Sequence, residues 1–308
     1  TGFSTITTNQ GDLVNYGIEL GLNANIVNGE FDWTLGGNIS FNRPEIRNLG
    51  LPPTQFGTRT VSAFLGRNVS GGTVFKVPAN IYIEGEAPGQ FWGYQTNGIV
   101  TDATDLSAAP SVQGVDPQLG DIFYVDQNGD GNVNDQDLTV IGDPNPDFTF
   151  GINSNFAYKN FSLDVFFNGV QGNDIANGNL GREGIALGNS NNVRTEAYVN
   201  AWREGRTDVT YPRLGYPVQG DFTDRMVEDG SFIRLTYVTL GYTLPVENIR
   251  AIRNINFFVT GHNLLLLTDY SGFDPEVNSF AFDAGRQGVD WNSFPRQRSV
   301  SFGLNLGF

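Results

Sequence analysis

Arg298-Ser-Val-Ser-Phe-Gly-Leu-Asn-Leu-Gly-Phe308 is the stretch that decides the predicted fold. Side chains along a β-strand point to opposite faces in turn, so one face of this stretch is apolar and the other holds serine, asparagine and glycine. The apolar face consists of Val300, Phe302, Leu304, Leu306 and Phe308. Strands of about 9–11 residues with this division build outer-membrane β-barrels, whereas strands in globular proteins usually have about 5–6 residues. The alternative is an edge strand of a water-soluble β-sandwich.

The same alternation recurs along the chain and predicts an all-β protein. Every second residue from Tyr16 to Ile26 is apolar, and those between are asparagine, glycine or glutamate. Asn28-Gly29 then marks a hairpin. The stretch from Phe31 to Phe41 repeats the pattern with aromatic residues near both ends, as in the interfacial girdles of a membrane barrel. About nine strands are predicted, at residues 15–26, 31–42, 73–84, 91–100, 147–159, 161–169, 231–244, 255–267 and 298–308.

Short and long connections alternate between these strands. Outer-membrane barrels have short periplasmic turns and longer extracellular loops. The predicted extracellular loops are residues 43–72, 101–146, 170–230 and 268–295. Because a bacterial barrel has an even number of strands, residues 1–308 are predicted to be the C-terminal part of a larger antiparallel transmembrane β-barrel. Its other strands and its plug domain are expected to lie outside this chain.

Composition excludes several classes of protein. Asp and Glu number 33 against 18 Lys and Arg, and a net charge of −15 argues against nucleic acid as a partner. The absence of cysteine excludes disulfides and thiolate metal sites. The sequence has no apolar run of about 18 residues that would predict a transmembrane helix. The 39 glycines and 24 phenylalanines favour strands and turns.

A twelve-residue stretch has the spacing of a calcium-binding loop. Such a loop supplies oxygen ligands from positions 1, 3, 5, 7, 9 and 12 and has glycine at position 6, where the chain turns sharply. Gly131 stands at position 6. The predicted ligands are Asp126, Asn128, Asp130, Asn132 (through its backbone carbonyl), Asn134 and Asp137. We expect a structural Ca²⁺ that braces an extracellular loop, and the alternative is a turn-rich segment that binds no metal.

No catalytic arrangement stands out, and the protein is predicted not to be an enzyme. His262 is the single histidine and lies within a predicted strand. The 33 acidic residues allow many carboxylate pairs, but no pair is marked by its context. Five aromatic residues in the predicted connections or in weaker strands have two interpretations, stacking on sugar rings or packing within their own segments. They are Trp92, Tyr94, Trp202, Tyr211 and Trp291.

Seven motifs spread over almost the whole chain resemble one family. They are Asn9-Gln-Gly-Asp-Leu-Val-Asn-Tyr-Gly-Ile-Glu19, Gly120-Asp-Ile-Phe-Tyr-Val-Asp-Gln-Asn-Gly-Asp-Gly131, Ile141-Gly-Asp-Pro-Asn-Pro-Asp-Phe-Thr-Phe-Gly151, Val170-Gln-Gly-Asn-Asp-Ile175, Phe232-Ile-Arg-Leu-Thr-Tyr-Val-Thr-Leu-Gly-Tyr-Thr-Leu-Pro245, Tyr270-Ser-Gly-Phe-Asp-Pro-Glu-Val277 and Gly288-Val-Asp-Trp291 with the C-terminal strand. Together they resemble the SusC/RagA family of TonB-dependent outer-membrane transporters of Bacteroidetes-type bacteria. The chain departs from the family at His262, where glutamine is usual.

The resemblance implies a plugged barrel of the 22-strand class in the cell outer membrane. It implies a SusD-like surface lipoprotein that covers the external mouth, TonB acting through the plug, and outer-membrane lipid around the wall. The implied function is import of a glycan or a peptide too large for porins. Phe308 at the C-terminus resembles the signal for barrel insertion.

Three other functions remain open at this point. The first is a secreted, calcium-dependent carbohydrate-binding β-module, which would bury Phe150 and Phe302 in a water-soluble core. The second is a glycan-degrading β-enzyme. The third is a barrel that serves as a structural or adhesive surface protein.

Overall fold

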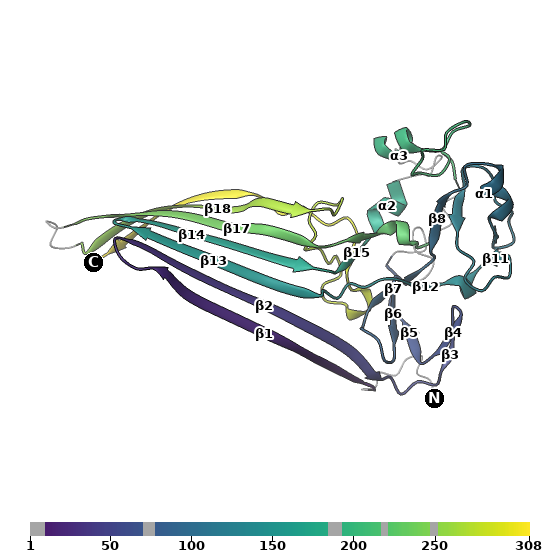
Figure 1. Ribbon diagram of the computed structural model, residues 1–308, viewed down its shortest axis with the longest axis horizontal. Helices are drawn as coiled ribbons and strands as arrows, with labels where there is room; N and C mark the ends of the chain where they lie inside the picture. The colour runs from purple at the N-terminus through teal and green to yellow at the C-terminus, as the bar shows by residue number, and fades with distance from the viewer. Residues whose placement is uncertain (1–9, 70–77, 184–192, 217–220, 247–251) are drawn as a thin grey trace, which may run out of the picture.

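The computed structural model describes residues 10–69, 78–183, 193–216, 221–246 and 252–308. It has two parts: a long, twisted sheet, and a body of short elements at one end of that sheet (Figure 1). The C-terminus lies at the opposite end of the sheet from the body.

Among the described residues, seven long strands form the antiparallel sheet in the order β1-β2-β13-β14-β17-β18-β20. They are β1 (Asp12–Val27), β2 (Phe31–Asn48), β13 (Phe148–Tyr158), β14 (Phe161–Gln171), β17 (Phe232–Leu244), β18 (Asn254–Thr268) and β20 (Ser299–Gly307). Within the part of the chain that the structure describes, β1 pairs with β2 alone and β20 with β18 alone, so the sheet is open at both edges.

One face of the sheet is apolar and exposed. Cross-strand pairing puts Leu22 of β1 beside Gly37 of β2 and then Ile152 of β13, and it puts Phe302 of β20 beside Val259 of β18. Leu22 is 71% exposed and Phe302 is 83% exposed. Exposed apolar patches of this extent are rare on water-soluble proteins, and the other face carries the small polar residues. The face therefore has the character of a surface that contacts lipid, and we call it the outer face.

Aromatic side chains gather near both ends of the outer face. At the end with the short turns, Trp33 stacks on Phe156 with ring centroids 5.7 Å apart. At the end next to the body, Phe41 lies against Phe148 with centroids 5.6 Å apart. Two such belts are the interfacial girdles of a membrane barrel.

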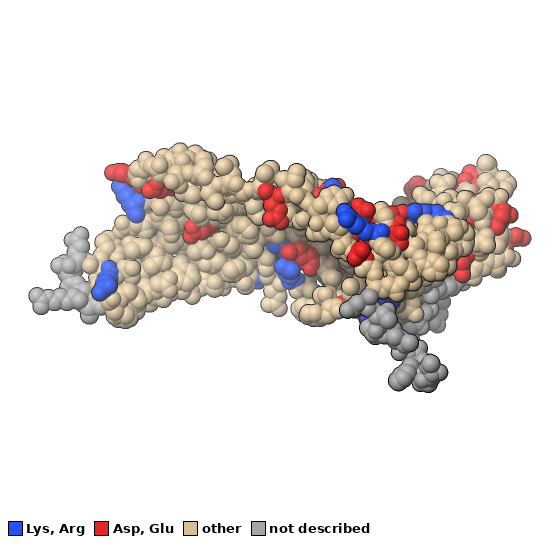
Figure 2. Space-filling view, turned by 90° about the horizontal axis from the view of Figure 1, so that it is seen from below, with Lys and Arg blue, Asp and Glu red and all other residues tan. Residues whose placement is uncertain are grey.

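The buried hydrophobic core lies in the body rather than against the sheet. One cluster packs around Trp92 and Ile81, and a second packs around Phe91 and Phe222. Figure 2 shows most charged side chains over this end of the molecule, while much of the sheet region carries few. No helix in the described ranges is long and apolar enough to cross a membrane.

The body is built from short elements that lie in the long connections. The connection from β2 to β13 holds β3 (Thr54–Phe56), β4 (Arg59–Val61), β5 (Ala63–Leu65), β6 (Asn80–Ile83), β7 (Gln90–Gly93), β8 (Thr96–Ile99), α1 (Ala103–Ala108), β9 (Ser111–Val112), β10 (Ile122–Tyr124), β11 (Asn132–Val133), the 3₁₀ helix η1 (Asp135–Asp137) and β12 (Thr139–Gly142). The later connections hold β15 (Asp174–Asn177), α2 (Gly178–Glu183), α3 (Thr195–Asn200), η2 (Asp224–Met226), β16 (Val227–Asp229), η3 (Ala284–Arg286) and β19 (Val289–Asp290).

The all-β, antiparallel barrel-type fold is confirmed, but the prediction of about nine barrel strands is wrong for the described residues. The predicted strands 73–84 and 91–100 overlap β6, β7 and β8, which belong to small separate sheets in the body. All four residues of β6 are buried. A four-residue strand is far shorter than the 9–11 residues that cross a bilayer. Residues 73–77 lie outside the described residues.

Two strands also differ from prediction in detail. β2 continues past Asn42 to Asn48. Beyond Ser40 it no longer pairs with β13, so Pro44 lies where one side of the strand is an edge, a position in a sheet at which proline is tolerated. In β17 the alternation of faces changes phase at a register shift between Leu235 and Tyr237.

With seven strands, the connections still alternate in length. The turns at residues 28–30 and 159–160 lie at the end of the sheet away from the body, as do the end of β17 and the start of β18. The described parts of the connections 49–147, 172–231 and 269–298 form the body. The predicted loop 43–72 begins within β2, and its described part beyond Asn48 lies in the same connection as 101–146. Their extracellular location stays a prediction.

Candidate functional site

The inner face of the sheet is polar, with aromatic exceptions that the sequence pattern did not predict. Phe166 of β14 stacks on Tyr237 of β17, with ring centroids 5.6 Å apart. The ring of Phe258 covers Gly303 of the neighbouring strand, where an added Cβ would lie 2.0 Å from it. His262 is exposed on this face, opposite Tyr237. The inner face is therefore a polar wall with local aromatic platforms.

The predicted calcium loop lies in the body between β10 and β12. Asp126 accepts hydrogen bonds from the backbone N–H groups of Gly129 and Gly131, both at 2.7 Å. These two glycines have φ values of 75° and 85°, in the left-handed region that favours glycine. The N–H of Gly131, with smaller help from that of Gly129, lowers the pKa of the Asp126 carboxyl. The loop therefore holds Asp126 in its charged form.

Asp137 closes the loop from its last position. Its side chain is fully buried, and its two oxygens accept from the N–H groups of Gln127 at 2.9 Å and Asn134 at 2.8 Å. A buried carboxylate needs such partners because desolvation penalises its charge. The fold thus brings Asp126 and Asp137, the first and last predicted ligands, close to each other.

The middle positions of the loop form a run of side-chain-to-backbone turns. Asn128 Oδ1 accepts from the N–H of Asp130, and Asp130 Oδ1 accepts from the N–H of Asn132, both at 2.8 Å. Asn134 Oδ1 likewise accepts from the N–H of Gln136 at 2.9 Å. Each oxygen keeps lone-pair capacity beyond these bonds.

In the described ranges, no three acidic or histidine side chains meet closely enough to hold a metal by themselves. A calcium ion here would therefore also need the amide oxygens of Asn128 and Asn134 and the carbonyl of Asn132, which are the hard oxygen donors that calcium accepts. The donor set fits calcium and does not fit a metal that prefers nitrogen or sulfur.

The loop aromatics mostly pack within the body. Trp92 is 2% exposed and Tyr94 is 5% exposed. Trp202 and Trp291 pack against the two core clusters. Tyr211 is partly buried. Packing within their own segments is therefore the interpretation that the structure supports. The most exposed aromatic residues of the body were not singled out from the sequence. They are Phe273, Phe282 and Phe294, all in the connection from β18 to β20.

A buried ionic cluster joins this same connection to the sheet. Arg234 of β17 is 3% exposed and donates to Asp274 Oδ1 at 2.6 Å. Its Nε lies 2.9 Å from Glu276 Oε2, and Arg296 also pairs with Glu276 at 3.1 Å. Buried charge pairs of this kind are strongly disrupted when one partner is removed. The cluster fixes the base of the connection against the end of β17.

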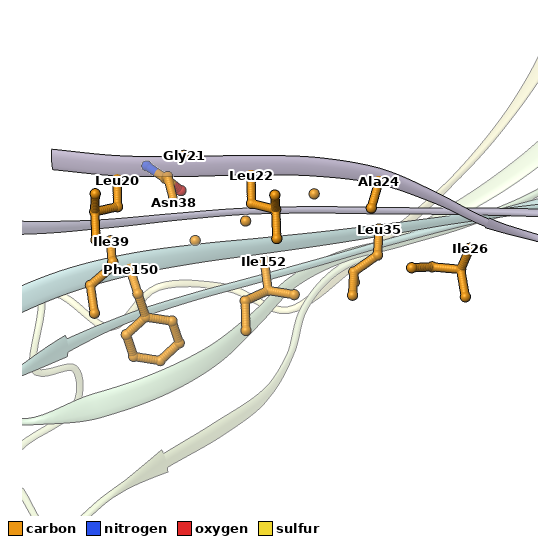
Figure 3. Close-up of a pocket in the computed structure, with 13 residues that line it drawn as sticks. Leu20, Gly21, Leu22, Ala24, Ile26, Leu35, Asn38, Ile39, Phe150 and Ile152 are labelled. Atoms are coloured by element: carbon orange, nitrogen blue, oxygen red, sulfur yellow. The ribbon is translucent and has the colours of Figure 1, made fainter.

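The outer face carries an apolar depression of about 520 Å³ over Gly37. Figure 3 shows Leu20, Leu22, Ile39, Phe150 and Ile152 projecting to the same side from neighbouring strands around it. An added Cβ at Gly37 would meet only Gly151 O, at 3.5 Å. The depression is part of the outer face and has the chemistry of a lipid contact.

The sheet defines a class of protein. It has strands long enough to span a bilayer, a bare apolar outer face with aromatic girdles, a polar inner face and a body at one end, which together define the wall of an outer-membrane β-barrel. A water-soluble module would have to bury Phe302 and Leu304, which are 83% and 52% exposed.

Comparison with known proteins agrees with this class. No family model matches the chain. The TonB-dependent receptor P3 of Formosa agariphila is 33% identical over the whole chain, which spans 30% of that receptor. The TonB-dependent receptor SusC of Bacteroides thetaiotaomicron is 28% identical over 98% of the chain, which spans 27% of SusC. A structure of the RagAB peptide transporter matches 97% of the chain with a TM-score of 0.72 and 23% identity, and the chain covers 29% of the matched protein.

The chain spans about 30% of the length of these relatives. It belongs to the SusC/RagA family of TonB-dependent receptors, and such receptors are proteins of the outer membrane. The relatives are receptors and transporters rather than enzymes.

Proposed function

We propose that the protein containing these residues imports a large nutrient, a glycan or a peptide, across the outer membrane in a TonB-dependent manner. The observation that carries the proposal is the bare apolar outer face on a sheet whose full length aligns with TonB-dependent receptors. In this mechanism the seven strands are part of the barrel wall, and the body at the end of the sheet is part of the external surface that first meets the cargo.

Two partners belong to the same proposal. A SusD-like surface lipoprotein would cover the external mouth, and TonB would act through a plug domain. Support for the pair comes from the relatives, because one is SusC and another is RagA within the RagAB peptide transporter. Support within the chain comes from the exposed rings of Phe282 and Phe294, which lie in one external connection and offer apolar area to a partner.

An uptake measurement tests the proposed function. Cells that carry the full-length receptor should accumulate labelled oligomers above the porin size limit, and they should lose this uptake when either the receptor gene or tonB is deleted. Uptake that continues at the same rate without TonB would contradict the mechanism. Separate glycan and peptide libraries identify which cargo is taken up.

We also propose that the loop from Asp126 to Asp137 binds a structural calcium ion. The support is the buried, hydrogen-bonded Asp137 at one end, the two backbone N–H groups that bond to Asp126 at the other, and the three side-chain-to-backbone turns between them. The ion would brace the connection from β2 to β13, and it has no part in chemistry.

Limited proteolysis of the full receptor tests the calcium proposal. Removal of calcium with a chelator should speed cleavage near residues 126–137, and Asp130→Ala should make cleavage fast with or without calcium. Asp116→Ala is the matched control, since Asp116 is an exposed acid in the same connection outside the loop. Equal cleavage rates with calcium and with chelator would refute the proposal.

A further inference from the structure

A small polar pocket lies where two connections meet in the body, the one from β14 to β17 and the one from β18 to β20. Its volume is about 270 Å³, and its lining contains no acidic side chain. It is lined by Asn177, Asn179, Arg194, Ser271, Gly272, Phe273, Asn292 and Ser293. Sites for drug-sized ligands have volumes of about 300–1,000 Å³, so this pocket matches a single small unit of a larger molecule.

The amide groups of the pocket are held in place by the fold. Asn177 is 2% exposed, and its Nδ2 donates to Glu228 Oε2 at 2.7 Å. Asn179 Oδ1 accepts from the N–H of Asn292 at 2.9 Å, which ties α2 to the segment after β19. The pocket therefore has positioned walls rather than loose surface side chains.

A second wall depends on a glycine and a tyrosine. Tyr270 Oη donates to Asp290 Oδ2 at 2.6 Å. An added Cβ at Gly272 would lie 2.4 Å from the Tyr270 ring, so only glycine permits this close approach. The turn brings Phe273 to the pocket, where its ring is 73% exposed.

Arg194 supplies the positive charge of the pocket. Its guanidinium pairs loosely with Glu196 Oε2, at 3.8 Å, and Glu196 is itself largely exposed. The nearby carboxylates of Glu228 and Asp290 are already hydrogen-bonded to Asn177 and Tyr270. A guanidinium has five N–H donors, so Arg194 has capacity for a tighter, bidentate partner such as a carboxylate.

We propose that this pocket binds one carboxylate-bearing sugar residue of a cargo oligosaccharide, with Arg194 pairing the carboxylate. The asparagine and serine groups match the donors and acceptors of sugar hydroxyls, and the exposed ring of Phe273 offers an apolar face to the sugar C–H groups. The inference rests on the proposed import function and names the chemistry of one contact within it.

Binding to the purified full receptor tests the inference with three matched probes. They are a β-1,4-linked glucuronate tetramer, the neutral glucose tetramer with the same linkage, and tetraglutamate. The native receptor should bind the glucuronate tetramer at least about tenfold more tightly than the neutral tetramer, since charge-assisted hydrogen bonds are worth this much. Equal binding of the acidic and neutral tetramers would overturn the inference, and so would binding of tetraglutamate as tight as that of the glucuronate tetramer.

Variants then assign the effect to the pocket. Arg194→Gln should reduce binding of the glucuronate tetramer about tenfold or more and leave the neutral tetramer unchanged. Glu196→Gln should strengthen binding of the acidic probe a few-fold, because it removes the competing carboxylate. Arg203→Gln is the matched control, an arginine of the same segment that bonds to the Tyr198 carbonyl and lies outside the lining. An Arg194→Gln receptor that binds the acidic probe like the native one would refute the assignment.

Uptake assays separate this inference from the proposed function. TonB-dependent uptake that shows no preference for the acidic tetramer would overturn the pocket assignment and leave the import function standing. Absence of TonB-dependent uptake of any oligomer would overturn the import function itself.

Discussion

Leu22→Arg tests whether the outer face meets lipid. The alternating apolar residues on the outer face of β1 run from Tyr16 to Ile26, which is about ten steps of 3.3 Å, or roughly 33 Å of strand. At a tilt of about 40° this length projects to roughly 25 Å, the height of the apolar band of an outer-membrane barrel. Leu22 lies next to the middle of that band, close to the bilayer midplane.

The expected loss follows from this position. An arginine on the lipid face at the midplane costs about 2–4 kcal/mol, which is roughly a 30- to 900-fold change in the folding equilibrium. Asn23→Arg is the matched control, because Asn23 is adjacent but points to the polar inner face. An exposed polar position tolerates such a change within about 0.5 kcal/mol.

The assay is reversible unfolding of the full receptor in lipid vesicles with a chemical denaturant, followed by tryptophan fluorescence and by heat-dependent gel mobility. Leu22→Arg should unfold at a clearly lower denaturant concentration than Asn23→Arg. If the two variants have the same midpoint, the outer face does not contact lipid, and the assignment of the sheet as a barrel wall fails.

Three further outcomes are expected. Gly17→Ala should destabilise the receptor by about 1–3 kcal/mol in the same unfolding assay, because the added Cβ would lie 2.1 Å from the Phe41 carbonyl oxygen. Gly21→Ala should be neutral or slightly stabilising, because its added Cβ would have nothing within 4 Å. Equal effects of the two variants would contradict the backbone contact. Arg234→Met should cost about 3–5 kcal/mol, because it removes the nearer and better-buried of the two arginines that pair with the buried Asp274. Adding Asp274→Leu should restore much of the loss, and an additive double variant would contradict the pairing. The pKa of the Asp126 carboxyl is lowered in the folded protein, so the stabilising effect of its charge is present above the ordinary aspartate pKa of about 3.9 and is lost as the pH falls through the lower folded value. Pepsin cleavage of the loop should therefore rise only below about pH 4. Cleavage that already rises near pH 6 would contradict the stabilising effect of Asp126.

The sequence predicted those features that depend on neighbouring residues. The alternation of apolar and polar residues from Tyr16 to Ile26 identified a strand, because successive side chains of a strand point to opposite faces and the pattern needs no distant residue. The loop from Asp126 to Asp137 was visible for the same reason, since all its positions lie within one twelve-residue stretch. The length of the C-terminal strand favoured a membrane wall over the edge strand of a soluble sandwich.

Features that depend on distant residues could not be predicted. β6 and β7 show the composition of strands, and only their packing into the body reveals that they leave the main sheet. Arg234 and Asp274 are 40 residues apart, and no local pattern pairs them. The polar pocket combines Asn177 with Asn292 through chain segments more than a hundred residues apart.

The two open margins of the sheet determine how this part of the receptor can be handled. The outward N–H and C=O groups of β1 and β20 have no ladder partner among the described residues, and in hydrocarbon each such group costs several kcal/mol. We therefore expect that a fragment containing only these strands would associate edge to edge and precipitate, as exposed margins do. Each of these strands can be stable in a bilayer only when a further strand lies alongside it, so folding of this wall is coupled to folding of its neighbours.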